Sequence, residues 1–255
     1  MGKKYKNSPI IEALCEIQLA PSQPWDLTLP GLVYERVRDQ FPDKKQQIGV
    51  GVQFRPTEKG LEHRVEPAPP RVQFYRKNQT ALIQVGPDLF VVNHLKPYPT
   101  WAAFKPLILE NFQVYREVAN PKGFKRIGLR YINKIIFHTE SVNLEEYFNF
   151  FPSIPKDLPQ FHEGFISRVE IPYFNNRDRI IITISNTSPE APKMLPIILD
   201  LDYIMVVQDG ISMEGFKEWL EEAHSVIEKT FESCITDKCR VLFEEINNGS
   251  SIIAE

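Results

Sequence analysis

Residues Phe124–Phe137, FKRIGLRYINKIIF, alternate between polar and apolar side chains along most of their length. A period of two is typical of a β-strand that buries one face, and this stretch is longer than an ordinary strand of about 5–6 residues. It predicts a long strand with a basic face and a face against the core. The basic face carries Arg126, Arg130 and Lys134; the core face carries Ile127, Leu129, Tyr131 and Ile135.

Shorter runs of the same kind precede this strand, separated by turn residues. We expect a helix that begins near Pro30 and ends before Pro42, and a longer helix from about Trp101 to Val118. Pro106 should either kink the second helix or move its start to a later residue. The expected strands are Ile10–Leu19, Gln47–Phe54, Arg71–Arg76, Thr80–Val85 and Leu89–Asn93.

The residues after the long strand follow a similar order. The clearest helix of the chain spans about Ser212 to Ser233, with Ser212 as its N-cap and an apolar stripe that includes Phe216, Trp219, Ala223 and Ile227. The other expected elements are a short helix at Leu144–Phe150, strands at Phe165–Phe174, Arg179–Asn186 and Ile197–Val207, a terminal helix at Asp237–Glu245, and a frayed tail over 247–255.

These elements predict an α+β protein with a largely antiparallel sheet, or two sheets, and two long amphipathic helices. We expect residues 1–255 to form one compact unit. Strands followed by a long helix occur twice, so the alternative is a duplicated α+β unit with similar halves, 1–138 and 139–246.

Composition narrows the class of protein further. The formal net charge is -3, which gives no overall attraction to nucleic acid or to an anionic membrane. No apolar run reaches the roughly 18 residues that a membrane span needs. Cys15, Cys234 and Cys239 form no CxxC pair and lie in apolar patterns, which predicts buried free thiols. With no signal-peptide pattern at the N-terminus, we expect a cytoplasmic protein.

Charged residues on two strands are the strongest candidate site. Asp200 and Asp202 share one strand face, as Arg126, Arg130 and Lys134 share another. The carboxylates are a candidate metal or acid–base pair, and the cations a candidate anion or nucleic-acid contact. The structural alternative is that the two sets are neighbours in the sheet and form cross-strand ion pairs.

Two further polar residues fall on apolar patterns. Asn133 lies on the core face of the long strand and must find hydrogen bonds, as a local organiser or as a ligand contact. His224 borders the apolar stripe of the last long helix, where a hydrogen bond to a neighbouring element is expected more often than catalysis. The sequence contains no nucleophile elbow, phosphate-binding loop or zinc-ligand spacing, so we predict no catalytic residue, metal site or cofactor.

Several stretches in the same order along the chain are similar to a sporadically distributed family of uncharacterised prokaryotic proteins of about this length. They are Asn7–Ala13, Gln84–Pro87 with Asn93, Tyr98–Trp101, Gly128–Asn133, Leu199–Asp202 and Trp219–His224. The resemblance implies a bacterial or archaeal origin. The patchy distribution of the family suggests horizontally transferred loci, such as those for defence or toxin–antitoxin pairs. The resemblance implies no activity.

The leading functional hypothesis is therefore a non-catalytic binding or interaction protein that recognises a protein partner or a small ligand, as a partner or sensor component of such a locus. The alternative is a nucleic-acid-binding protein or a metal-dependent nuclease, acting through Arg126, Arg130 and Lys134 together with Asp200 and Asp202.

Overall fold

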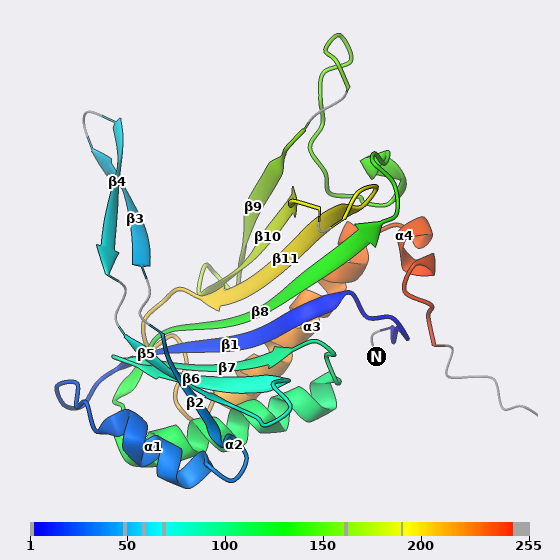
Figure 1. The fold of residues 1–255 in the computed structure, drawn as a ribbon. Helices are drawn as coiled ribbons and strands as arrows, with labels where there is room; N and C mark the ends of the chain where they lie inside the picture. The colour runs from blue at the N-terminus through cyan, green and yellow to red at the C-terminus, as the bar shows by residue number, and fades with distance from the viewer. Residues whose placement is uncertain are drawn as a thin grey trace, which may run out of the picture.

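The computed structural model describes residues 3–47, 50–57, 60–67, 70–160, 163–189 and 191–246, with side chains described outside 47–69. An antiparallel sheet of nine strands, in the order β2-β5-β6-β7-β1-β8-β11-β10-β9, forms the centre of the molecule (Figure 1). Its strands are β1 Ile10–Ala20, β2 Asp43–Gln47, β5 Arg71–Tyr75, β6 Ala81–Gly86, β7 Leu89–Leu95, β8 Gly123–Phe137, β9 Ile166–Tyr173, β10 Asp178–Asn186 and β11 Leu195–Met205. The expected α+β class is confirmed.

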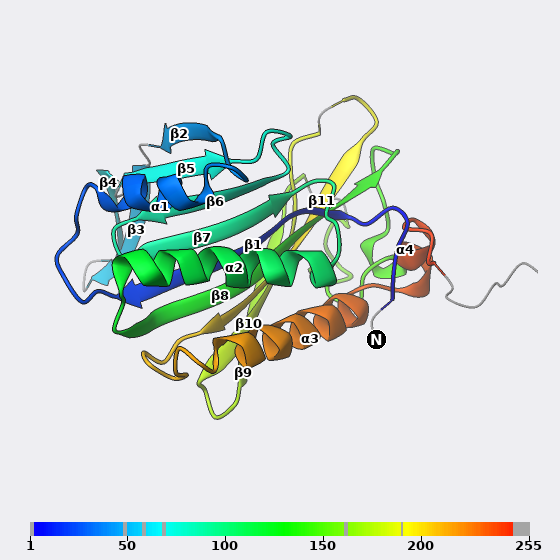
Figure 2. The ribbon, with the colours of Figure 1, turned by 90° about the horizontal axis from the view of Figure 1, so that it is seen from below.

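The long helices all cover the same face of this sheet. Figure 2 shows α1 (Leu29–Val37), α2 (Trp101–Ala119) and α3 (Phe216–Cys234) side by side in front of the strands. The short helix α4 (Asp237–Val241) follows α3. The main apolar cluster lies between the helices and the sheet, and it includes Phe104, Ile108, Trp219 and Leu220. In the described part of the chain, no helix is both long and apolar enough to cross a bilayer.

β1 and β8 pair with each other at the centre of the sheet. The long strand expected from alternation is therefore confirmed as β8, which pairs with β1 on one side and β11 on the other. Its apolar residues Ile127, Leu129, Tyr131 and Ile135 are buried as predicted. The opposite side chains of β8 point away from the helices, because successive residues of a strand alternate between faces.

Apart from the edge strand β2, the order of strands in the sheet is symmetrical about the β1–β8 pair. The meander β5-β6-β7 adds to β1 and is followed by α2, while the meander β9-β10-β11 adds to β8 and is followed by α3. The first series of elements therefore runs from β1 to α2, and the second series begins with β8 and ends with α3.

The structure differs from the expected elements mainly at positions without apolar alternation. The run 47–54 was expected to be one strand. Instead, β2 ends at Gln47, and β3 (Val50–Thr57) pairs with β4 (Gly60–Pro67) in a separate hairpin. The described side chains 43–46 of β2 are exposed at the sheet edge, so no hydrophobic pattern marks this strand.

Helix boundaries account for the other differences. The predicted Ser212 N-cap is wrong: α3 begins at Phe216 with Gly215 as its cap, and the Ser212 hydroxyl accepts from the Gly215 N–H within the preceding turn. Helix α2 begins at Trp101 with Pro106 inside it, so the later start was also wrong.

The segment expected to be a helix at 144–150 contains only the 3₁₀ turn Leu144–Glu146, since the backbone at Phe148 leaves the helical path to form a bridge with Ile235. Helix α4 is shorter than expected, and the tail 247–255 lies outside the described residues.

Candidate functional site

The sheet face opposite the long helices carries a continuous group of polar side chains, which we call the polar face. It includes all five charged residues singled out on the two strands: Arg126, Arg130 and Lys134 of β8, and Asp200 and Asp202 of β11. These strands are hydrogen-bonded neighbours, with Arg130 directly opposite Asp202 and Ile132 opposite Asp200. The expected cross-strand proximity of the two sets is therefore present.

Arg130 forms a two-pronged ion pair with Asp200. Its Nε lies 2.8 Å from Oδ1 of Asp200, and its Nη2 donates to Oδ2 of the same carboxylate. The guanidinium of Arg130 thus binds Asp200, which is diagonally opposite, rather than Asp202, which is directly opposite in the strand pair. The carboxylate of Asp200 is mostly buried, with 16% of its side chain exposed, so solvent screens this pair less than it would a fully exposed one.

Arg126 joins β1 to β11 across a glycine. Its Nη1 lies 3.0 Å from Oε1 of Glu16, and its Nη2 lies 3.4 Å from Oδ2 of Asp202. Gly128 lies beneath this bridge: a Cβ there would be 3.3 Å from Oδ1 of Asp202 and 3.4 Å from the Arg126 guanidinium. The absence of a side chain at Gly128 therefore leaves the space in which these charged groups meet.

Asp202 is the carboxylate most affected by its surroundings. Burial raises its pKa to about 6, although Arg126 and Arg130 oppose the shift, and the neighbouring Asp200 and Glu16 add to it. Near neutral pH, part of the Asp202 population therefore carries a proton.

A chain of side-chain hydrogen bonds continues the polar face across the other half of the sheet. Gln73 of β5 donates to Gln84 of β6 (3.2 Å), Gln84 donates to Asn93 of β7 (2.9 Å), and Asn93 donates to Glu12 of β1 (2.7 Å). Gln84 and Asn93 are buried. Because an amide can both donate and accept, these side chains orient one another, and every hydrogen bond of the chain is donated in the direction from β5 to β1.

A hollow of about 300 Å³ lies at one end of the polar face. It is connected to the ion-pair group through Gln18, whose amide donates to Glu16 at 3.0 Å. Arg71 and Lys125 also border it, and Lys125 pairs with Asp88 at 2.9 Å. The polar face therefore contains a concave region next to a pre-arranged group of donors and acceptors.

Asn133 and His224 do not belong to this group, because both lie on the helix side of the sheet. Asn133 is 2% exposed, and its amide donates to the Leu199 carbonyl at 3.0 Å. It therefore acts as a local organiser between β8 and β11.

The His224 ring stacks on Trp101, with ring centroids 4.3 Å apart and planes inclined by 8°. This contact joins α3 to the start of α2, where Trp101 Nε1 also donates to Glu221 at 2.8 Å. Burial lowers the pKa of His224 to about 4, so the imidazole is neutral at pH 7. The contact expected of His224 with a neighbouring element is thus a ring stack rather than a hydrogen bond.

The analysis of the sequence did not identify Asp178, which lies between the expected strands Phe165–Phe174 and Arg179–Asn186. This residue begins β10 and is fully buried. Its carboxylate accepts hydrogen bonds from Arg177, from the Tyr203 hydroxyl at 3.0 Å and from Trp219 Nε1 at 3.3 Å. Donors from three elements therefore hold one buried charge, as a buried carboxylate requires. No local sequence signal marks it, since two of its partners lie far along the chain.

Comparison with known proteins adds no assignment. The chain matches no family model, and no curated protein matches it. Within the described ranges, no three His, Cys, Asp or Glu side chains are grouped so that they could hold a metal ion. The three cysteines are buried and free, as expected, and burial raises the thiol pKa of Cys234 to about 11.

Pattern analysis missed the other residues of the polar face, among them Glu12, Glu16, Gln84 and Asn93. The first three lie between apolar neighbours on predicted strands and Asn93 ends such a strand, which is the available signal, but their convergence depends on the order of strands in the sheet. The stretches that carry the family resemblance supply Glu12, Gln84, Asn93, Arg130, Asp200 and Asp202, and these residues come together on this one surface.

Proposed function

We propose that the protein is a non-catalytic binding protein whose polar face recognises a protein partner. The observation that supports this most directly is that hydrogen-bonded polar side chains occur on each strand from β5 to β11, on the sheet face that the long helices leave uncovered. They form a chain that ends at Glu12 and the separate ion pairs of Arg126 and Arg130. Arg126 and Arg130, whose side chains are 29% and 40% exposed, are fixed by their ion pairs and would lose little further side-chain freedom when a partner binds them.

The charges of this surface favour a protein over nucleic acid. The guanidinium groups of Arg126 and Arg130 are bonded to Glu16, Asp200 and Asp202. A phosphate group would have to compete with these carboxylates for the positive charge of either arginine, whereas nucleic-acid affinity depends on cations that are available to phosphates. Mixed donors and acceptors around a hollow fit the polar contacts of a protein interface, which has about one hydrogen bond per 100–200 Å².

Two finer statements belong to the same proposal. The sporadic distribution implied by the family resemblance favours a partner encoded in the same locus, as in a defence or toxin–antitoxin system. The symmetry of the sheet about β1 and β8 favours an origin of the fold by duplication of one α+β unit.

The proposal is tested with a pair of matched substitutions. Gln18→Arg changes the rim of the hollow, and Gln113→Arg places the same side chain on the exposed side of α2. Tagged wild-type protein and both variants are cross-linked in cells of the source organism, and the captured proteins and cross-linked positions are identified by mass spectrometry.

We expect a specific protein that cross-links to the polar face of the wild type and of Gln113→Arg, and that is lost with Gln18→Arg. Capture that depends on Gln113 instead would refute the assignment of the surface. Salt-dependent binding of DNA or RNA that is abolished by Arg130→Ala would favour the nucleic-acid alternative.

A further inference from the structure

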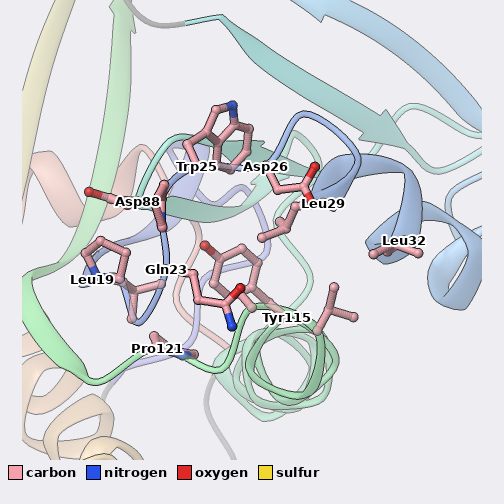
Figure 3. Close-up of a pocket in the computed structure, with 13 residues that line it drawn as sticks. Leu19, Gln23, Trp25, Asp26, Leu29, Leu32, Asp88, Tyr115 and Pro121 are labelled. Atoms are coloured by element: carbon pink, nitrogen blue, oxygen red, sulfur yellow. The ribbon is translucent and has the colours of Figure 1, made fainter.

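A second, smaller cavity lies at the other side of the sheet, between the start of α1 and the C-terminal half of α2 (Figure 3). Its volume is about 100 Å³, several times the space that one water molecule needs. It lies on the helix side of the sheet and shares only Asp88 with the lining of the hollow, so its other lining residues are independent of those behind the proposed function.

The chain around this cavity is held in place by backbone contacts and prolines. The Lys122 N–H donates to the Ala20 carbonyl at 2.8 Å, and the Leu19 N–H donates to the Asp88 carbonyl at 2.8 Å. Pro21, Pro24 and Pro121 line the wall, and each fixes its own backbone φ. The cavity is thus bounded by a constrained backbone.

Tyr115 provides an unpaired polar group inside the cavity. Its side chain is 3% exposed, and its hydroxyl makes no hydrogen bond to the described part of the protein. No fully enclosed side-chain polar atom in the described residues lacks a partner, so this hydroxyl keeps some accessible surface, and Tyr115 is one of the residues that line the cavity. Figure 3 shows it pointing away from α2, into the space between Trp25 and Asp88.

The polar groups of the wall are acidic or neutral. Asp26 and Asp88 contribute carboxylates, and no Lys or Arg is among the residues that line the cavity. One oxygen of Asp88 pairs with Lys125 outside the cavity, which leaves its other oxygen as an acceptor. The apolar part of the wall comes from Leu19, Leu29 and Trp25, whose aromatic ring can also face a cation.

We propose that this cavity binds the alkylammonium group of a small free amine. The ammonium donates hydrogen bonds to the Asp88 carboxylate and to the Tyr115 hydroxyl oxygen, while the alkyl chain contacts Leu19, Leu29 and the Trp25 ring. Burial and Asp88 together raise the pKa of Tyr115 to about 12, so the hydroxyl stays neutral and its oxygen lone pairs are available as acceptors.

The test uses the full chain and the indole N–H signals of its three tryptophans in NMR spectra, with Trp25→Phe to assign the Trp25 signal. n-Butylammonium is titrated beside 1-butanol and butyrate, which have a similar shape but a neutral or a negative end. We expect saturable shifts of the Trp25 signal with n-butylammonium, a Kd on the order of 1 mM for so small a ligand, and binding of the other two at least tenfold weaker.

Two variants locate the polar contacts. Tyr115→Phe should keep the wild-type melting temperature, because the hydroxyl has no bond to lose, and should weaken n-butylammonium binding about three- to tenfold. Asp88→Asn should weaken it about tenfold. Tyr173→Phe, on the distant strand β9, is the matched control and should leave the Kd unchanged.

The proposal is wrong if the Trp25 signal does not respond up to 50 mM n-butylammonium, if the three probes bind equally, or if Tyr115→Phe binds as the wild type does. Acetylated and amidated lysine carries the same butylammonium group on a peptide backbone. Stronger binding of this compound than of n-butylammonium would place the ligand on a protein and overturn the assignment to a free amine.

Discussion

Replacing Asp178 with alanine removes the buried carboxylate that joins β10, β11 and α3. The side chain is 0% exposed, and its loss leaves the Tyr203 hydroxyl and the Trp219 indole N–H without their acceptor. Arg177 is affected less, because it is 27% exposed and keeps Glu222 at 3.1 Å.

The structure sets the size of the effect. A buried donor left without a partner costs about 1–3 kcal/mol, so the two donors together predict a loss of about 2–6 kcal/mol in the free energy of unfolding. With a urea m-value of about 3 kcal/mol/M for a chain of this size, the unfolding midpoint should fall by roughly 0.7–2 M. Asp178→Asn keeps an acceptor oxygen in place and should cost about half as much.

Urea unfolding followed by tryptophan fluorescence and by circular dichroism measures these midpoints. Asp157→Ala is the matched control, because Asp157 is exposed and the same substitution there should change the free energy of unfolding by less than about 0.5 kcal/mol. If Asp178→Ala shifts the midpoint no more than Asp157→Ala does, the carboxylate does not organise the three elements, and the argument from buried donors fails.

Three more substitutions test other contacts. Trp219→Ala should cost about 3–5 kcal/mol in unfolding free energy, as expected for an aromatic side chain that is 1% exposed; an unchanged urea midpoint would contradict its place in the core. Arg130→Ala should lower the free energy of unfolding by about 1–2 kcal/mol, because Asp200 loses its guanidinium partner at a site that solvent partly screens. Binding of polyanions should stay negligible in the wild type and in the variant. Normal stability together with the loss of a measurable affinity for polyanions would refute the ion-pair role. Asp202 has a pKa of about 6 in the folded state against 3.8 for an unperturbed aspartate, so between these values the folded state holds a proton that the unfolded state has lost. The free energy of unfolding should therefore fall by about 2 kcal/mol as pH rises from about 4 to about 6, and Asp202→Asn should remove this decline in urea midpoints measured at both pH values.

Much of the fold was predictable because its strongest signals are local. The alternation over β8 and the apolar stripe of α3 report which face each element buries, and both elements lie where those patterns indicate. Strand β2 could not be recognised, since an exposed edge strand has no buried face to impose a pattern. The start of α3 was misplaced because Ser212 has the chemistry of an N-cap but is used in the turn before it.

The candidate site was predictable only in part, since strand order decides which polar residues meet. The faces of Arg126, Arg130, Asp200 and Asp202 follow from the period of two, and their pairing could be stated as an alternative. The contribution of Glu16 depends on β1 lying beside β8, although their sequences are far apart. The space over Gly128 depends on the same three-strand register, which no single strand sequence specifies.

The central position of β1 has a consequence for biosynthesis. This strand leaves the ribosome before the other strands of the sheet, yet its two neighbours, β7 and β8, end 75 and 117 positions after Ala20, at Leu95 and Phe137. At about 5–20 residues per second, β7 is completed roughly 4–15 s after β1, and β8 later still. During that interval the nascent chain presents Ala13, Cys15, Ile17 and Leu19, which the folded protein buries, on a strand with both edges open. Nascent chains that stall before Phe137 should therefore depend on chaperones to stay out of aggregates.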